Sequence, residues 1–263
     1  MFIYFGFDDG CKDLKSCIDK SKIIITAIPF SKDGKYVFAP LSTKCISIDE
    51  FVNLASDKII IGGSFKEEYI KKFNEKQNHV IDIMKDESFA LNNTIPTAEG
   101  VIKIIIENTD ITIDRSNIAV LGFGRVGKKV AKLLKSLNAN VFCYDNKEEE
   151  LANINSSGYN VLGDICGSLN NMDVIINTVP SLILEKSNLN FVNKETLIID
   201  VSSKPGGIDF DYAKEHNYNV IHALGLPGKV APRTSAKYIK ELLRNIIIWG
   251  VWNVKKGKWK YLY

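Results

Sequence analysis

Short apolar segments alternate with longer amphipathic segments along most of the chain. In the first part, runs rich in Ile and Val predict strands, and the segments between them carry apolar residues at helical spacing. The predicted strands are 2–7, 23–28, 58–62 and 80–83, and the predicted helices include 48–55 and 66–76. This alternation is typical of a parallel sheet that helices cover on both faces.

The segment 92–100 (NNTIPTAEG) interrupts this pattern. Thr94 is predicted to cap a helix whose first turn accepts Pro96 and which continues to about Asn108. The alternation then resumes, with predicted strands at 117–121, 140–144, 174–177, 197–200 and 220–222, a helix at 126–137, and a last helix from about Ala231 towards Trp249. We therefore expect two doubly wound α/β domains with a cleft between them: residues 1–93, an interdomain helix within 94–112, and residues 113–263.

Composition narrows the class of protein. The 263 residues are 45% hydrophobic and 25% charged, which excludes a disordered chain, a collagen repeat and a disulfide miniprotein. The net charge of +3 is spread along the chain, so neither nucleic acid nor a membrane is expected as a partner. The longest apolar runs fall far short of the roughly 20 residues of a membrane helix. No secretory leader is evident, so a cytoplasmic protein is expected. The cysteines and histidines do not cluster, so no metal is predicted.

The sequence GFGRVG, from Gly122 to Gly127, is the strongest local motif. It follows an apolar strand and opens a helix, as a dinucleotide-binding turn requires. Gly122 permits the tight turn, Gly124 lets the backbone approach a pyrophosphate, and Gly127 allows close packing of helix and strand. The helix begins at Arg125 and Val126, where free N–H groups and partial positive charge favour a phosphate.

Asp145 ends the next predicted strand, 23 residues after Gly122. A carboxylate there accepts hydrogen bonds from an adenosine ribose and repels a 2′-phosphate, which favours NAD over NADP. Asn146 and Lys147 follow directly, and a lysine beside the ribose partly neutralises a phosphate. The local chemistry therefore favours NAD and leaves NADP open.

Two later strand ends are expected to face the nicotinamide, because ligands bind at the carboxyl ends of parallel strands. One carries Thr178, Val179 and Pro180, whose tight backbone packs against a ring. The other carries Ser202 and Ser203, two small hydroxyl residues that are expected to contact the substrate. Ordinary turn chemistry explains either segment taken alone, but their joint placement favours a functional site.

Charged side chains near these strand ends are candidates for substrate binding. Lys204 and Arg233 are expected to bind two carboxylates through charge-assisted hydrogen bonds. His222, at the end of the last predicted strand, is either an acid or base near neutral pH or a half-buried structural histidine. Thr97 and Glu99, in the interdomain helix, are expected to close the cleft from its other side.

At these residues the sequence resembles the A subunit of dipicolinate synthase from spore-forming bacteria. The resemblance rests on four blocks in the right order: 93–100 (NTIPTAEG), 118–127 (IAVLGFGRVG), 176–184 (INTVPSLIL) and 199–232 (IDVSSKPGG through LPGKVAP). It implies a flavodoxin-like N-terminal domain followed by a Rossmann domain. It also implies that the chain joins a flavoprotein-like B subunit and oxidises dihydrodipicolinate to pyridine-2,6-dicarboxylate in the mother cell, with NADP as the usual acceptor. A homo-oligomer is also expected.

Two features depart from that family. Residues 1–7 resemble the second strand of the N-terminal domain, so a shortened domain is expected. Small or basic residues follow the second Rossmann strand in the family, whereas Asp145 stands here, so NAD and NADP both stay open. Within the proposed chemistry, the proton acceptor is His222, Glu99 or water.

Two other functions fit the same pattern. One is a 2-hydroxyacid or amino-acid dehydrogenase on the same two-domain plan, although no Glu–His pair after Lys204 matches the 2-hydroxyacid enzymes. The other is a non-catalytic nucleotide-binding protein that regulates a flavoprotein partner.

Overall fold

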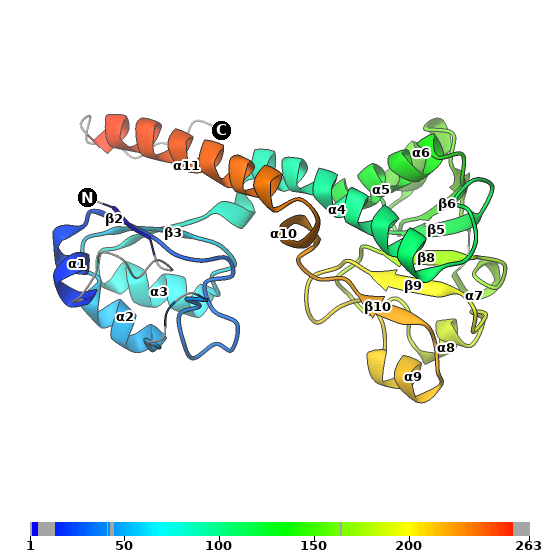
Figure 1. The fold of residues 1–263 in the computed structure, drawn as a ribbon, viewed down its shortest axis with the longest axis horizontal. Helices are drawn as coiled ribbons and strands as arrows, with labels where there is room; N and C mark the ends of the chain where they lie inside the picture. Colours follow the sequence, from blue (N-terminus) through cyan, green and yellow to red (C-terminus); the bar gives the residue numbers. More distant parts are fainter. Residues whose placement is uncertain (1, 5–13, 41, 43–44, 164, 255–263) are drawn as a thin grey trace. The chain divides into compact units, whose positions relative to one another are not determined.

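The computed structural model describes residues 2–4, 14–40, 42, 45–163 and 165–254 (Figure 1). The chain forms two compact units, residues 1–90 and 91–263. Each unit is built around its own parallel sheet, with helices connecting the strands. The fold class predicted from the sequence, two parallel-sheet α/β domains, is confirmed.

The first unit contains a four-stranded sheet in the order β1-β2-β3-β4. Its elements are β1 (Phe2–Tyr4), α1 (Leu14–Lys20), β2 (Ile23–Ile25), α2 (Ile48–Leu54), β3 (Ile59–Gly62), α3 (Glu67–Glu75), β4 (His79–Asp82) and η1 (Ile83–Lys85). Phe30, Phe51 and Phe73 are fully buried in its core. Phe65 stacks on Phe30, with ring centroids 4.6 Å apart. All four predicted strands are present. β2 and β3 are shorter than predicted, and β4 lies one residue earlier than the predicted 80–83. Residues 5–7 of the first predicted strand lie outside the described residues.

Helix α4 (Glu87–Asn108) begins earlier than the sequence predicts. Thr94 is not its N-cap: the Asp86 carboxylate instead accepts a hydrogen bond from the Phe89 N–H at 2.7 Å, which satisfies one free donor of the first turn. Pro96 therefore lies inside the helix rather than in its first turn. The hydroxyls of Thr94 and Thr97 donate to the carbonyls of Leu91 and Asn93, in the turns on either side of the proline.

The second unit contains a six-stranded parallel sheet in the order β10-β9-β8-β5-β6-β7. The strands are β5 (Asn117–Leu121), β6 (Asn140–Tyr144), β7 (Asn160–Val161), β8 (Val174–Asn177), β9 (Leu197–Asp200) and β10 (Val220–His222). The helices that follow α4 are α5 (Arg125–Ser136), α6 (Glu148–Ser156), α7 (Ile165–Ser168), α8 (Lys186–Leu189), α9 (Phe210–Glu215), α10 (Leu226–Val230) and α11 (Pro232–Val254).

Both faces of this sheet are buried, as successive residues of β5 show. Ile118 and Val120 belong to a core that also contains side chains of α4 and α5. Ala119 and Leu121 belong to a second core, with side chains of α7, α8 and α9. Strand side chains alternate between faces, so helices cover the sheet on both sides (Figure 1). Cys143, in β6, is buried in the first core, and burial raises the pKa of its thiol to about 12.

None of the helices within the described ranges combines the length and the apolar character that a membrane crossing requires.

Candidate functional site: a dinucleotide-binding strand edge

The strand order reverses at β5. From β5 the chain adds β6 and β7 on one side of the sheet, and then β8, β9 and β10 on the other. Doubly wound sheets bind ligands at the carboxyl ends of the strands flanking such a reversal. The glycine turn and most of the other site residues predicted from the sequence follow these strand ends.

Two glycines of the turn occupy positions that tolerate no side chain. Gly122 has a φ of +91°, and a Cβ there would stand 2.6 Å from the Thr178 hydroxyl. A Cβ on Gly127 would overlap the carbonyl oxygen of Gly122, so α5 packs against the turn only without one. The structural reasons for Gly122 and Gly127 therefore match those given from the sequence.

Side chains from neighbouring strand ends hold the turn in place. The Asp145 carboxylate accepts from the Phe123 N–H at 2.8 Å and from the Lys147 N–H at 3.1 Å. The Thr178 hydroxyl donates towards the carbonyls of Leu121 and Gly122, at 3.0 and 3.2 Å. Each Asp145 oxygen keeps a lone pair for a further hydrogen bond. Asp145 and Thr178 thus shape the turn, a role that the sequence analysis did not assign to them.

Gly124 is the exposed N-cap of α5, and no side chain caps the helix there. A Cβ built on Gly124 meets no other atom within 4 Å, so the backbone is open to an approaching ligand. The first N–H groups of α5, at Arg125 and Val126, follow directly. This arrangement has the open backbone and the positive helix end that a pyrophosphate requires. The residues present therefore fit the phosphate portion of a dinucleotide.

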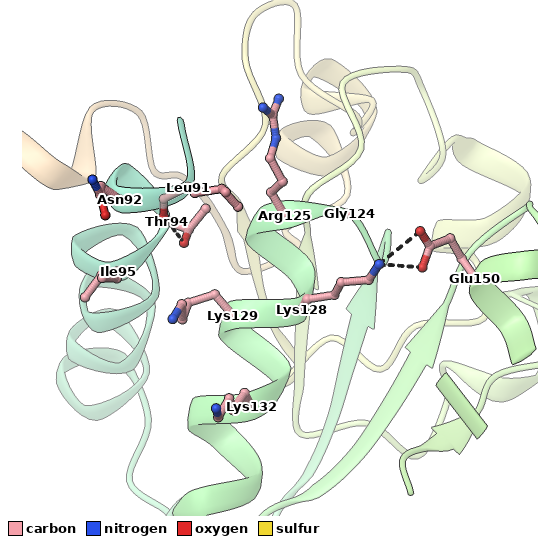
Figure 2. Close-up of a pocket in the computed structure, with 10 residues that line it drawn as sticks. All are labelled: Leu91, Asn92, Thr94, Ile95, Gly124, Arg125, Lys128, Lys129, Lys132 and Glu150. Carbon is pink, nitrogen blue, oxygen red and sulfur yellow. Dashed lines mark hydrogen bonds and ion pairs between the residues drawn. The ribbon is translucent and has the colours of Figure 1, made fainter. Parts of the chain in front are cut away.

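A basic groove of about 740 Å³ adjoins the turn (Figure 2). On the α4 side it is lined by Leu91, Asn92, Thr94 and Ile95, and on the α5 side by Gly124, Arg125, Lys128, Lys129 and Lys132, with Glu150 beyond. Figure 2 shows Lys129 on the α4 side of α5 and Lys128 directed to Glu150. The Lys128 ammonium lies 2.8 Å from Glu150, and this contact lowers the pKa of the Glu150 carboxyl. The sequence signal for this groove is the helical i, i+3, i+4 and i+7 spacing of its basic residues.

The loops after β8 and β9 share one buried hydrogen-bond network. Asn177 and Asp200 are fully buried, and the Asn177 amide donates to Asp200 at 3.0 Å. The other hydrogen bonds of the Asn177 side chain are with the backbone of Val179. Asp200 also accepts from the N–H groups of Ser202 and Gly207, at 2.8 and 2.9 Å. The network fixes the backbone at both predicted nicotinamide-facing loops, although neither Asn177 nor Asp200 was predicted as a site residue.

Ser202 and His222 differ from these satisfied groups. The Ser202 Oγ and the His222 Nε2 are buried without a hydrogen-bond partner. Among the described residues, no other buried side-chain nitrogen or oxygen atom lacks one. The His222 ring stacks on Phe210, with centroids 4.6 Å apart.

The charged candidates lie at the surface. Ser203, Lys204 and Arg233 are exposed, as is Glu99 in α4. Within the described ranges, no ion pair or hydrogen bond joins Lys204, Arg233 or Glu99 to another predicted site residue. The carboxylate clamp of Lys204 and Arg233 therefore stays a prediction.

The described residues include no group of three or more His, Cys, Asp or Glu that could hold a metal ion.

The fold and the turn define a class of protein. Residues 106–202 match the family model of the NAD-binding domain of D-isomer specific 2-hydroxyacid dehydrogenases. A transhydrogenase from Sinorhizobium meliloti, 13% identical, shares the fold with a TM-score of 0.59 over 88% of this chain and 75% of its own. The second unit is thus a nicotinamide-nucleotide-binding domain of the dehydrogenase type.

More similar proteins give the family. The structure of the dipicolinate synthase A subunit from Bacillus halodurans is 30% identical, with a TM-score of 0.79 over 87% of this chain and 82% of its own. The corresponding dipicolinate synthase structure from Bacillus subtilis is 27% identical, with a TM-score of 0.83 over 98% and 89%. In sequence, the A subunit from Bacillus subtilis (strain 168) is 35% identical over 175 residues, or 66% of this chain. That match spans 59% of the relative's length. The chain belongs to the family of dipicolinate synthase A subunits.

Proposed function

We propose that the chain oxidises dihydrodipicolinate to dipicolinate (pyridine-2,6-dicarboxylate) with a nicotinamide coenzyme, in the cytoplasm of the mother cell during sporulation. The observation that carries the proposal is the turn from Gly122 to Gly127, preformed in a chain of this family. Membership of the family suggests the substrate, and the turn suggests where the coenzyme binds.

The glycine turn and the start of α5 bind the coenzyme pyrophosphate in this proposal. Asp145 accepts hydrogen bonds from the adenosine ribose through its remaining lone pairs. Thr178, Val179 and Pro180 support the nicotinamide, which accepts a hydride when it is bound. Asp145 favours NAD, whereas the resemblance to the family favours NADP, so the proposed experiment uses both coenzymes.

Lys204 and Arg233 bind the two carboxylates of the substrate, with Ser202, Ser203 and Thr97 as further contacts. The dihydropyridine loses one hydrogen as a hydride to the coenzyme and another as a proton, to His222, Glu99 or water. Because the product is aromatic, the reaction is favourable in this direction. The protein mainly supplies orientation and electrostatic stabilisation.

A flavoprotein-like B subunit is the proposed protein partner, and a homo-oligomer is the proposed form of the chain. The purified chain is mixed with the dihydrodipicolinate precursor and NAD or NADP, with and without this partner, while ultraviolet absorbance follows the pyridine product. Coenzyme-dependent product supports the proposal. Coenzyme binding without product in every mixture supports a non-catalytic nucleotide-binding role instead.

A second candidate function is oxidation of a 2-hydroxy acid, because the matched family model belongs to enzymes of that class. The late strand ends lack the Glu–His pair that those enzymes use. Turnover of 2-hydroxy acids, measured as reduced coenzyme at 340 nm, would favour this candidate over the first.

A further inference from the structure

Two buried polar atoms at neighbouring strand ends have no partner. Ser202 is only 4% exposed, and its Oγ makes no hydrogen bond. His222 is half-buried, and its Nε2 atom is covered and makes no hydrogen bond. Buried polar groups in folded proteins are nearly always paired, so an exception needs an explanation, such as a ligand that completes the site.

Both residues adjoin Asp200 along the chain or across the sheet. His222 of β10 is in register with Asp200 of β9, and the Asp200 carboxylate accepts from the Ser202 N–H. Phe210 links the two sides: its ring stacks on His222 and lies 2.7 Å from a Cβ built on Gly206. A Cβ on Gly206 would also stand 3.0 Å from the Asp200 carboxylate. Because Gly206 has no side chain, Phe210 and the Asp200 carboxylate can lie close to its backbone.

The cluster lies on the nicotinamide side of the strand reversal. Asp145, the proposed ribose ligand, directly follows β6 on one side of β5, whereas β8, β9 and β10 lie on the other. A dinucleotide whose pyrophosphate sits at the glycine turn extends its second half over β8 and β9. Adjacent strands are about 4.8 Å apart, so the end of β9 is about 10 Å from that of β5. A nicotinamide riboside bridges such a distance.

We propose that Ser202 and His222 bind the carboxamide of the nicotinamide, with the Ser202 hydroxyl donating to its oxygen and the His222 Nε2 accepting from its NH₂. A carboxamide offers one acceptor and one donor group, matching a hydroxyl that donates and an imidazole nitrogen that accepts. It is uncharged, which suits a buried position without a cation. The exposed Lys204 and Arg233 are the better partners for the substrate carboxylates.

This inference rests on the proposed function and deepens it. It assigns the Ser202 hydroxyl and the buried nitrogen of His222 to the coenzyme. Ser203 and Thr97 are then the further substrate contacts, and the proton passes to Glu99 or water. Ser202 and His222 then fix which part of the nicotinamide ring faces the substrate.

The test measures coenzyme affinity by fluorescence titration of the full chain, with the reduced coenzyme that the wild type binds better. Ser202→Ala removes only the hydroxyl, and His222→Phe keeps a flat ring against Phe210 without its nitrogens. Each variant is expected to weaken binding about three- to tenfold, the usual value of one neutral hydrogen bond. The matching ADP-ribose fragment, which lacks nicotinamide, should bind wild type and variants equally.

A coenzyme analogue separates the two contacts. In the reduced 3-acetylpyridine analogue, a methyl group replaces the NH₂, so its carbonyl remains but its donor is lost. The wild type should bind this analogue less tightly than the coenzyme, and that difference should vanish in His222→Phe. Ser202→Ala should still weaken binding of the analogue by the same factor as for the coenzyme.

Thr196→Val is the control. Thr196 directly precedes β9, at the end of the strand opposite to Ser202, and its buried hydroxyl donates to the Met172 carbonyl at 2.7 Å. It should lower thermal stability and leave coenzyme affinity unchanged, whereas Ser202→Ala should not lower stability. Unchanged coenzyme affinity in both site variants, or an equal loss for ADP-ribose, would overturn the inference while the proposed function stands. A wild type that binds neither ligand would overturn both.

Discussion

The turn after β5 and the loops after β9 and β10 lie at the same edge of one sheet, yet they differ in how their polar groups are satisfied. In the turn, Asp145 and Thr178 bond the backbone directly. On the other side, Ser202 and the last residue of β10, His222, keep buried atoms without partners. Lys204, after β9, and Arg233, in α11, are exposed cations.

The difference indicates two modes of construction. The turn is complete without a ligand, because its shape depends on glycine positions and on bonds within the protein. Asn177 and Asp200 fix the backbone of the loops through hydrogen bonds. The Ser202 hydroxyl and the His222 Nε2, in contrast, need a ligand to complete their hydrogen bonding. Substitutions at the closely packed positions of the turn, Gly122 and Gly127, should therefore change folding, whereas substitutions in the loops should change binding.

The largest effect is expected for Gly127→Ala. Its Cβ would overlap the Gly122 carbonyl, so α5 must shift away from β5. Overpacking of this kind costs about 3 kcal/mol of unfolding free energy, and coenzyme binding should be lost with the turn. Urea denaturation measures the first and fluorescence titration the second.

Gly124→Ala is the matched control, since a Cβ there meets open space. It should change the unfolding free energy by less than about 0.5 kcal/mol. It should nevertheless weaken coenzyme binding, because the Cβ occupies the path of the pyrophosphate. Equal stability losses in the two variants would contradict the proposed role of Gly127 in packing.

Lys204→Met and Arg233→Met test the loop side of the comparison. Each should raise KM for the dicarboxylate about tenfold to a hundredfold, the value of a charge-assisted hydrogen bond. Coenzyme affinity and thermal stability should stay at wild-type values, because neither side chain bonds the turn. Steady-state kinetics of pyridine formation supply the measurement, and an unchanged KM in both variants would rule out the clamp.

Asp145→Asn tests a residue that serves both shape and selectivity. Removing the carboxylate charge should shift the ratio of NADP to NAD affinity about tenfold towards NADP. The amide has one acceptor for two N–H groups, so the unfolding free energy should also fall by about 1 kcal/mol. Parallel titrations with both coenzymes measure the ratio. A constant ratio would show that Asp145 acts on the turn alone.

The smallest effect is expected for Glu150→Gln, beside the basic groove. Lys128 lowers the pKa of the Glu150 carboxyl, so the folded state holds the charged form more strongly than the unfolded state does. This stabilisation is full above the ordinary pKa of 4.5 and disappears as pH falls through the lower folded pKa. At pH 7 the variant should be less stable by about 0.5 kcal/mol, a value typical of a surface pair.

Stability measured from pH 7 to pH 3 gives the sign. The difference between wild type and Glu150→Gln should be constant above about pH 5 and shrink below it, because both side chains are then uncharged. A difference that grows in acid would mean that the pair does not set the pKa of Glu150.

The alternation of apolar and amphipathic segments was sufficient to predict the two parallel-sheet domains. The ends of the strands differ from the prediction: β4 stops at Asp82 because that side chain caps η1. The predicted start of α4 was wrong, because the helix is capped by Asp86 and not by Thr94. Propensity favours a proline in the first turn, but α4 continues through Pro96, and Ala98, Val101 and Ile105 beyond it are buried in the core.

The glycine turn could be predicted from the amino-acid sequence alone. Gly122 and Gly127 occupy positions where a side chain does not fit, so the spacing of the glycines identifies the turn. The sequence could not show that Asp145 and Thr178 bond the turn, or that Asn177 and Asp200 meet beneath the loops, since each pair comes from strands far apart in the chain. Which buried atoms lack a partner is also decided only when the strands pack, because a hydrogen bond depends on positions in space and not on spacing along the sequence.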